Sequence, residues 1–231
     1  MITETMTPQE TLDEMIRDRV ELMQLVRQYF LRGGCKQLRT SKTFPCQVAC
    51  MLKTKTANNY ITIMAFNSKS DVFNFNPILS FGAVVETEKG KMLLCANLNM
   101  DARAIKPFYF LPHLFQRFKE RMNFKQEGVE LVRAFYKRNS DLVMHTDYRR
   151  NGKDGDKYVM LTCHDGAVFG YRHPDDRDTL VLCTFVANDT MQDGYKARFN
   201  WRFNDAIKDG EKEVAMLMPT YAANPTKLRK Q

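Results

Sequence analysis

Hydrophobic residues near the amino terminus recur with the period of an α-helix. Thr7, Pro8 and Glu10 supply the cap, the first-turn proline and the capping-box acid of a helix start. Gly33-Gly34 marks the expected end. The pattern predicts one long amphipathic helix, whose apolar series is Leu12, Ile16, Val20, Met23, Val26 and Phe30.

The pattern changes to strands between Cys35 and about Leu98. Segments 47–53, 60–67, 81–87 and 91–97 are rich in apolar, β-branched or aromatic residues and alternate in part. Glu88-Lys89-Gly90 predicts a hairpin turn between the last two segments, and Asn58-Asn59 and 74–77 are further breaks. We expect an antiparallel sheet packed on the first helix.

From Ile105 the predicted order is β-α-α-β-β-β and then a closing helix. A short strand over 105–111, with Pro107 in it, leads to a helix opened by Pro112 and a second helix over 126–138. The second helix should bury Val129, Leu131, Val132, Phe135 and Tyr136. Three strands are expected over 157–163, 167–171 and 179–187, with a polar loop at 149–156 before them, turns at Asp165-Gly166 and 173–177, and a helix from Thr190 to about Met218. The tail after Pro219 should fray.

This order predicts an α+β fold. Residues 1–100 would form the amino-terminal helix and antiparallel sheet, and residues 101–231 the second helix-and-sheet core. The two parts could also share one core and count as a single domain.

Composition is that of a globular protein: 44% of residues are hydrophobic and 27% are charged. Sixteen Phe and nine Tyr argue against disorder. No apolar run approaches the roughly 18 residues of a membrane span, and the amino terminus lacks the layout of a secretion signal. We therefore expect a cytoplasmic protein with no membrane partner.

Six cysteines are scattered along the chain, and none forms a Cys-x-x-Cys pair. Cys46 and Cys50 would lie about 13 Å apart in an extended segment, too far to share a metal ion. Phosphate-loop, dinucleotide-binding, nucleophile-elbow and His-Glu-x-x-His patterns are also lacking. We expect no metal and no cofactor.

The net charge of +8 is unevenly spread. Residues 101–150 carry eleven Lys/Arg against six Asp/Glu, and Lys227, Arg229 and Lys230 add charge near the carboxy terminus. This balance favours a polyanionic partner.

The helix opened by Pro112 carries the only constellation that suggests chemistry. His113, Arg117 and Arg121 follow one another at i, i+4 and i+8 and so form one stripe. Leu114, Phe118 and Met122 form a parallel apolar stripe beside it. An imidazole and two permanent cations would line the rim of a helix that buries its other side.

The element order and this stripe resemble a loose set of small bacterial domains related to the barnase, EndoU, colicin nuclease and RelE group of metal-independent ribonucleases. The matching residues lie within about 105–191 and are Pro112, His113, Arg117, Arg121, Asp165-Gly166 and Thr184. The chain is similar, too, to uncharacterised proteins of Bacteroides-type bacteria that pair this helix with a Thr-Phe strand ending in Asn-Asp-Thr-Met. The resemblance implies a RelE/barnase-like core, RNA as a substrate and an antitoxin as a possible partner.

Cleaving RNA without a metal requires a base, an acid and cations that stabilise the phosphorane. His113 is the predicted base, because a position in the first helical turn favours its neutral form. Arg117 and Arg121 would grip the phosphate, and Tyr171, His173 or Thr184 would carry the second proton or orient the phosphate. Arg172 and His173 are further candidates for contacts with nucleic acid.

Three functions remain open from the sequence. The first is a toxin-like endoribonuclease centred on His113. The second is a non-catalytic module that uses the same basic stripe to bind RNA, DNA or an acidic protein. The third is a structural accessory protein, in which Arg117 and Arg121 only pair with Glu120, Glu127 or Glu130.

Overall fold

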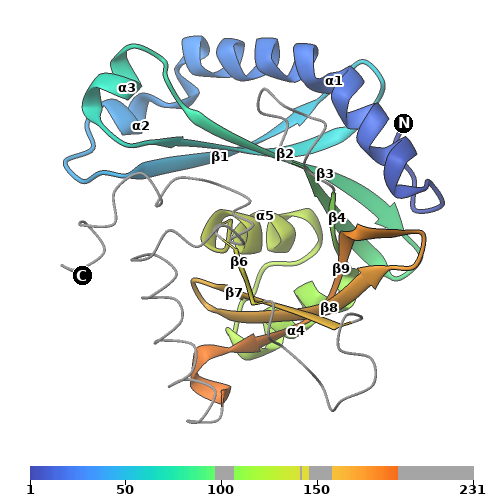
Figure 1. Ribbon diagram of the computed structural model, residues 1–231. Coiled ribbons are helices and arrows are strands. Elements are labelled where there is room, and N and C mark those ends of the chain that lie inside the picture. The colour runs from blue at the N-terminus through green and yellow to red at the C-terminus, as the bar shows by residue number, and fades with distance from the viewer. Residues whose placement is uncertain (97–106, 141, 146–157, 192–231) are drawn as a thin grey trace. The chain divides into compact units, whose positions relative to one another are not determined.

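The computed structural model describes residues 1–96, 107–140, 142–145 and 158–191, and it confirms the predicted α+β class (Figure 1). The chain divides into two compact units, Met1–Tyr109 and Phe110–Gln231. A short 3-10 turn, η2, covers Asn188–Thr190. The rest of the predicted closing helix, the loop at 149–156 and the tail after Pro219 lie outside the described residues.

The first helix, α1 (Pro8–Tyr29), begins as predicted. The backbone N–H of Thr7 donates to Glu10 Oε2 at 2.8 Å, and the Glu10 N–H donates to Thr7 Oγ1 at 3.3 Å. The bond from the Thr7 N–H, together with one from the Thr7 hydroxyl to Glu10 Oε2 at 2.8 Å, holds the pKa of Glu10 below its ordinary value. A π-helical turn, η1 (Phe30–Gly34), continues the helix and closes at Gly33, whose φ of 88° is easy only for glycine.

The buried side of α1 differs from the predicted apolar series. The side chains of Val20, Met23 and Ile16 are 68%, 45% and 36% exposed. The buried residues are Pro8, Thr11, Leu12, Glu14, Met15, Asp18, Leu22 and Val26. The prediction was wrong for half of the series. The buried side holds Met15 and Leu22, which the series left out, and the acidic Glu14 and Asp18, which have polar partners there.

The amino-terminal unit holds an antiparallel sheet in the order β1-β2-β3-β4. Its strands match the four predicted segments closely: β1 (Cys46–Lys53), β2 (Asn59–Phe66), β3 (Ile78–Thr87) and β4 (Gly90–Ala96). The predicted hairpin turn joins β3 to β4, with the Thr87 hydroxyl donating to the Gly90 carbonyl at 2.8 Å. Tyr60 on β2 points to α1, where its hydroxyl meets a carboxylate.

Two short helices in this unit were not predicted. They are α2 (Lys36–Arg39) and α3 (Lys69–Phe73). Each spans little more than one turn, too few residues for hydrophobic periodicity to register. The Ser68 side chain caps α3 by accepting the Asp71 N–H at 3.1 Å.

The carboxy-terminal unit continues from a short strand, β5 (Phe108–Phe110), whose residues span the division between the units. Helices α4 (Pro112–Arg121) and α5 (Gly128–Arg138) follow, as predicted. The sheet order is β9-β8-β7-β6, all antiparallel. Its strands are β6 (Val143–His145), β7 (Tyr158–Cys163), β8 (Gly166–His173) and β9 (Asp176–Ala187). Strand β6 was not predicted, because three residues carry no alternation that could be recognised.

Aromatic rings hold α4 and α5 on one face of this sheet. Phe118 lies 5.1 Å from Phe135 and 5.3 Å from Phe185, both in edge-to-face geometry. Such pairs add roughly 0.5–1.5 kcal/mol each to the effect of burial. The predicted inward residues of α5 are buried except Val129, which is partly exposed.

The corrected orientation of α1 predicts opposite outcomes for two of its apolar residues. Leu22 is fully buried, so Leu22→Ala should lower the free energy of unfolding by about 3 kcal/mol. The exposed Val20 should tolerate Val20→Ala within about 0.5 kcal/mol. Urea unfolding followed by circular dichroism measures both. Equal losses in the two variants would contradict the orientation of the helix.

Candidate functional site

Helix α4 brings His113 and Arg117 together on its exposed side. The Arg117 Nε–H group donates to His113 Nε2 at 3.4 Å. His113 is exposed, and the Arg117 side chain is 44% exposed. Leu114 and Phe118 of the predicted apolar stripe are buried, whereas Met122 is the C-cap residue of the helix and is only partly buried. What the polar stripe does stays a prediction.

Carboxylates neutralise part of the charge on these helices. Arg117 Nη1 lies 3.0 Å from Glu120 Oε2, and Lys119 Nζ lies 2.5 Å from Glu127 Oε1. The hydrogen bond and the charge from Lys119 hold the pKa of Glu127 below its ordinary value. Since most of these groups face solvent, each pair stabilises the fold by less than about 1 kcal/mol. A competing anion can therefore replace the carboxylate.

Arg121 has a different role from Arg117. Its Nη1–H group donates to the backbone carbonyl of Phe185, so the side chain joins α4 to β9. Among the residues that the structure describes, no other hydrogen bond of this guanidinium is found. The stripe therefore presents one exposed cation beside a histidine, and a second cation that is anchored to the sheet.

Tyr171 and Thr184 lie on the sheet face away from α4. Phe185 packs on Phe118 of α4, so its neighbour Thr184 points to the opposite face. Thr184 is paired with Phe169, which packs on a separate buried cluster. The register shift after Phe169 adds its extra residue, Cys183, to β9, so β8 keeps its alternation and Tyr171 shares the face of Phe169. Burial raises the pKa of the Tyr171 hydroxyl. The sequence alone did not show which face of the sheet each strand residue points to. In the structure, Tyr171 and Thr184 point to the face opposite α4 and are therefore separated from His113.

His173 is the last residue of β8, and the turn to β9 follows it. The Asp175 N–H donates to His173 Nδ1 at 3.2 Å, and the Asp175 carboxylate lies 3.9 Å from the same nitrogen. Arg172 precedes it, is partly exposed and is paired with Leu180 of β9. These contacts give His173 a local structural role, and its predicted contact with nucleic acid stays untested.

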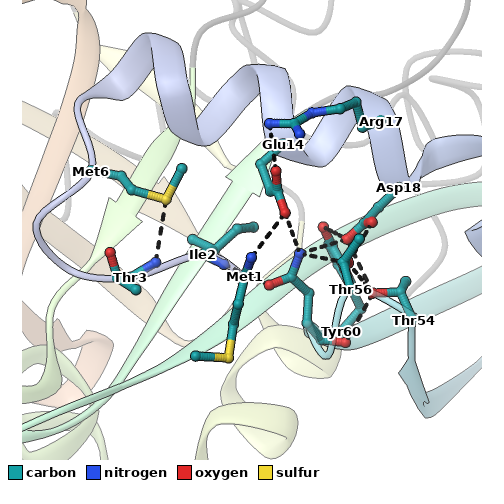
Figure 2. Close-up of polar contacts among 11 residues, drawn as sticks. Met1, Ile2, Thr3, Met6, Glu14, Arg17, Asp18, Thr54, Thr56 and Tyr60 are labelled. Carbon is teal, nitrogen blue, oxygen red and sulfur yellow. Dashed lines mark hydrogen bonds and ion pairs between the residues drawn. The ribbon is translucent and has the colours of Figure 1, made fainter.

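A buried polar cluster in the amino-terminal unit was missed by sequence reasoning (Figure 2). Asp18 of α1 is 2% exposed. Its Oδ2 atom accepts hydrogen bonds from Tyr60 Oη at 2.9 Å, Asn58 Nδ2 at 2.7 Å and Thr54 Oγ1 at 3.1 Å. Its Oδ1 atom accepts from Thr56 Oγ1 at 2.7 Å. One carboxylate thus joins the helix to the turn between β1 and β2 and to the start of β2.

Glu14 lies one turn before Asp18 and is 5% exposed. It receives Arg17 Nη2 at 2.6 Å, Asn58 Nδ2 at 3.4 Å and the amino group of Met1 at 3.1 Å. Burial, and then the charge of Asp18, raise the pKa of the Tyr60 hydroxyl. The sequence held two signals: the acids Glu14 and Asp18 at i and i+4 within the first helix, and the polar turn that contains Asn58. A search for hydrophobic periodicity takes account of neither.

This cluster has a structural role, because it holds α1 to the β1–β2 turn and to β2. Both carboxylates have several donors, and a metal ion would have to displace them. Across the described ranges, no group of three or more His, Cys, Asp or Glu side chains is arranged to hold a metal ion.

A second structural polar cluster lies in the carboxy-terminal unit at the predicted Asp165-Gly166 turn. Arg138 binds the Asp165 carboxylate through two hydrogen bonds of 2.7 and 2.6 Å, and Asn139 Nδ2 donates a third at 3.0 Å. Burial raises the pKa of Asp165, but the bonds from Arg138 and Asn139 outweigh it and hold the pKa below 3.8. The ion pair correspondingly raises the pKa of Arg138.

Comparison of the chain with protein-family models, curated proteins and solved structures finds no match in any of the three. The resemblance to the RelE and barnase group therefore stays a prediction. The α+β class rests on the structure itself. No described helix combines the length and apolar character that a membrane span requires.

Asp18→Ala should lower the free energy of unfolding by about 3 kcal/mol, because the buried donors of Tyr60, Thr54 and Asn58 lose their acceptor. Asp13→Ala is the matched control, since Asp13 is an exposed acid on the same helix. It should change stability by less than about 0.5 kcal/mol. Chemical denaturation measures both, and an equal loss of unfolding free energy in the two variants would contradict the structural role of Asp18.

The lowered pKa of Asp165 should make the fold less stable in acid. Because its pKa is lower in the folded than in the unfolded chain, its carboxylate stabilises the fold above about pH 4. That stability is lost as the pH falls through the folded pKa. Asp165→Asn should cost about 2 kcal/mol at pH 7 and less at pH 3. Denaturation curves across this range test the sign, which is wrong if the difference between the two proteins grows as the pH falls.

Proposed function

We propose that the chain binds nucleic acid through the exposed side of α4 and α5, without cleaving it. The observation that carries this proposal is the exposed pair of His113 and Arg117, joined at 3.4 Å on one helical turn. Residues 112–139 hold seven Lys/Arg against three Asp/Glu, so a positive field surrounds the pair.

Phosphate fits this pair in both charge and geometry. The planar guanidinium of Arg117 can donate two parallel hydrogen bonds to a phosphate, and its present partner Glu120 is itself 46% exposed. Exchange of that carboxylate for a phosphate loses little, because exposed ion pairs are weak. Because His113 accepts from Arg117 at Nε2, the other ring nitrogen, Nδ1, carries the hydrogen and remains a donor.

Binding is better supported than cleavage. A ribonuclease of the kind expected from the sequence needs a second proton carrier opposite His113. Tyr171 and Thr184 point to the sheet face away from α4, and Arg121 is bonded to the Phe185 carbonyl. These contacts favour a non-catalytic module over the toxin-like enzyme.

A labelled RNA of mixed sequence tests the proposal in buffer with EDTA. We expect retardation of intact RNA by the wild-type protein, and a roughly ten-fold weaker affinity for Arg117→Ala. Lys89→Ala is the matched control, because it removes one exposed cation from the β3–β4 turn of the other unit. It should bind RNA as the wild type does, and circular dichroism should confirm that all three proteins are folded.

Other outcomes would replace this function by one of the alternatives. Cleavage by the wild type that is lost in His113→Ala would identify an endoribonuclease. Binding of polyglutamate, with no binding of RNA or DNA, would indicate an acidic protein partner such as an antitoxin. No binding at all, together with lower stability of His113→Ala and Arg117→Ala, would leave a structural role.

A further inference from the structure

The amino-terminal unit carries a long segment with cations and no acids. Residues 22–70 contain eight Lys/Arg and not one Asp or Glu. All eight side chains belong to exposed residues: Arg27, Arg32, Lys36, Arg39, Lys42, Lys53, Lys55 and Lys69. Such segregation of charge creates a local field that the modest net charge of the whole chain does not convey.

Four of these cations belong to η1, α2 and α3, which lie at one end of the unit (Figure 1). Helices α2 and α3 pack against each other beside the end of α1 (Figure 1). The ring of Phe30 lies 4.6 Å from Phe75 and 6.2 Å from Phe66, which ties η1 to the residues after α3 and to the end of β2. The Arg39 guanidinium lies 5.7 Å from the centre of the Phe30 ring. Arg32, Lys36, Arg39, Lys69 and Phe73 are called the α2–α3 surface below.

The cations of this surface keep their charge available. None of the ion pairs found among the described residues involves one of them. The nearest acid in sequence, Asp71, accepts from Ser68 Oγ at 2.7 Å and from Asn76 Nδ2 at 3.1 Å. Those hydrogen bonds hold the pKa of Asp71 below its ordinary value, and they commit the carboxylate to the local turn.

Phe73 gives the surface an aromatic face. Its side chain is 63% exposed although it belongs to a helix that packs on the fold. Lys69 Nζ lies 6.0 Å from the centre of its ring, so a cation and an aromatic plane are offered together. Proteins that bind single strands combine these two elements: bases stack on the ring, and cations follow the phosphates.

We propose that the α2–α3 surface binds single-stranded nucleic acid, with an unpaired base stacked on Phe73 and phosphates held by Arg32, Lys36 and Lys69. This site lies on a different unit from the α4 stripe and does not rest on the function proposed for that helix. Either site can fail in experiment while the other remains.

Other polyanions fit the surface less well. A duplex hides its bases and would leave Phe73 without a partner. An anionic membrane needs a continuous apolar helix face, whereas α2 and α3 have only four and five residues. The exposed apolar side chains here are Leu31 and Phe73, which come from two different elements.

Fluorescence anisotropy of a labelled oligouridylate with the full chain tests the proposal. Phe73→Ala should weaken binding roughly ten-fold, the effect of one lost base stack. The triple variant Arg32→Ala, Lys36→Ala, Lys69→Ala should lower the slope of log affinity against log salt by about 2, since each single-strand phosphate contributes about 0.7. Val20→Ala controls for an exposed apolar side chain and Lys89→Ala for an exposed cation. Both controls should bind as the wild type does.

Three results would overturn the proposal. The first is equal affinity for the oligouridylate and for a duplex of the same length. The second is a Phe73→Ala variant that binds like Val20→Ala. The third is binding to vesicles of phosphatidylserine and phosphatidylcholine without binding to the oligonucleotide, which would assign the surface to a membrane. Arg117→Ala in the same assay separates the two sites, because it leaves the α2–α3 surface intact.

Discussion

The carboxylate of Asp18 decides how the amino-terminal unit is assembled. It is buried at 2% exposure and accepts four hydrogen bonds from the β1–β2 turn and the start of β2. A buried charge without donors would be too costly to keep, so these four bonds are what allow α1 to turn this side to the sheet. That rotation leaves Val20 and Met23 in solvent, although their spacing marks them as apolar-face residues. The orientation of the helix combines this polar anchor with the burial of Leu12, Met15, Leu22 and Val26 on the same side.

The two units hold their helices to their sheets through different interactions. The carboxy-terminal unit fixes its helices with the edge-to-face rings of Phe118, Phe135 and Phe185, and adds the Arg138–Asp165 pair at the edge of the packing. Aromatic packing tolerates small shifts, whereas a bidentate ion pair requires one geometry. The result is a stable sheet with an exposed helical side on which cations stay near solvent.

Both proposed surfaces share one physical feature, which is a cation whose partners are weak or absent. Within the described ranges, Arg117 contacts the exposed His113 and Glu120 of α4, and the cations of the α2–α3 surface enter none of the ion pairs found there. Arg138 and Arg121, by contrast, are bound to a buried carboxylate and to a backbone carbonyl. Arginine content alone does not separate these cases. The contacts of each guanidinium separate them, and they identify α4 and the end of α1 as the candidate binding surfaces.

The sequence by itself determined the α+β class, the start of α1 at Thr7, the four strands of the first sheet and the helix opened by Pro112, because caps, turns and periodicity are local. It also placed His113 and Arg117 one turn apart. Only the tertiary structure decided that Thr184 and Tyr171 point away from α4, since the parity of a strand depends on which face meets the core. Likewise, only the fold brought Asp18 to Tyr60 and Arg138 to Asp165. Those partners lie far apart in the chain, and no local pattern encodes a contact between them.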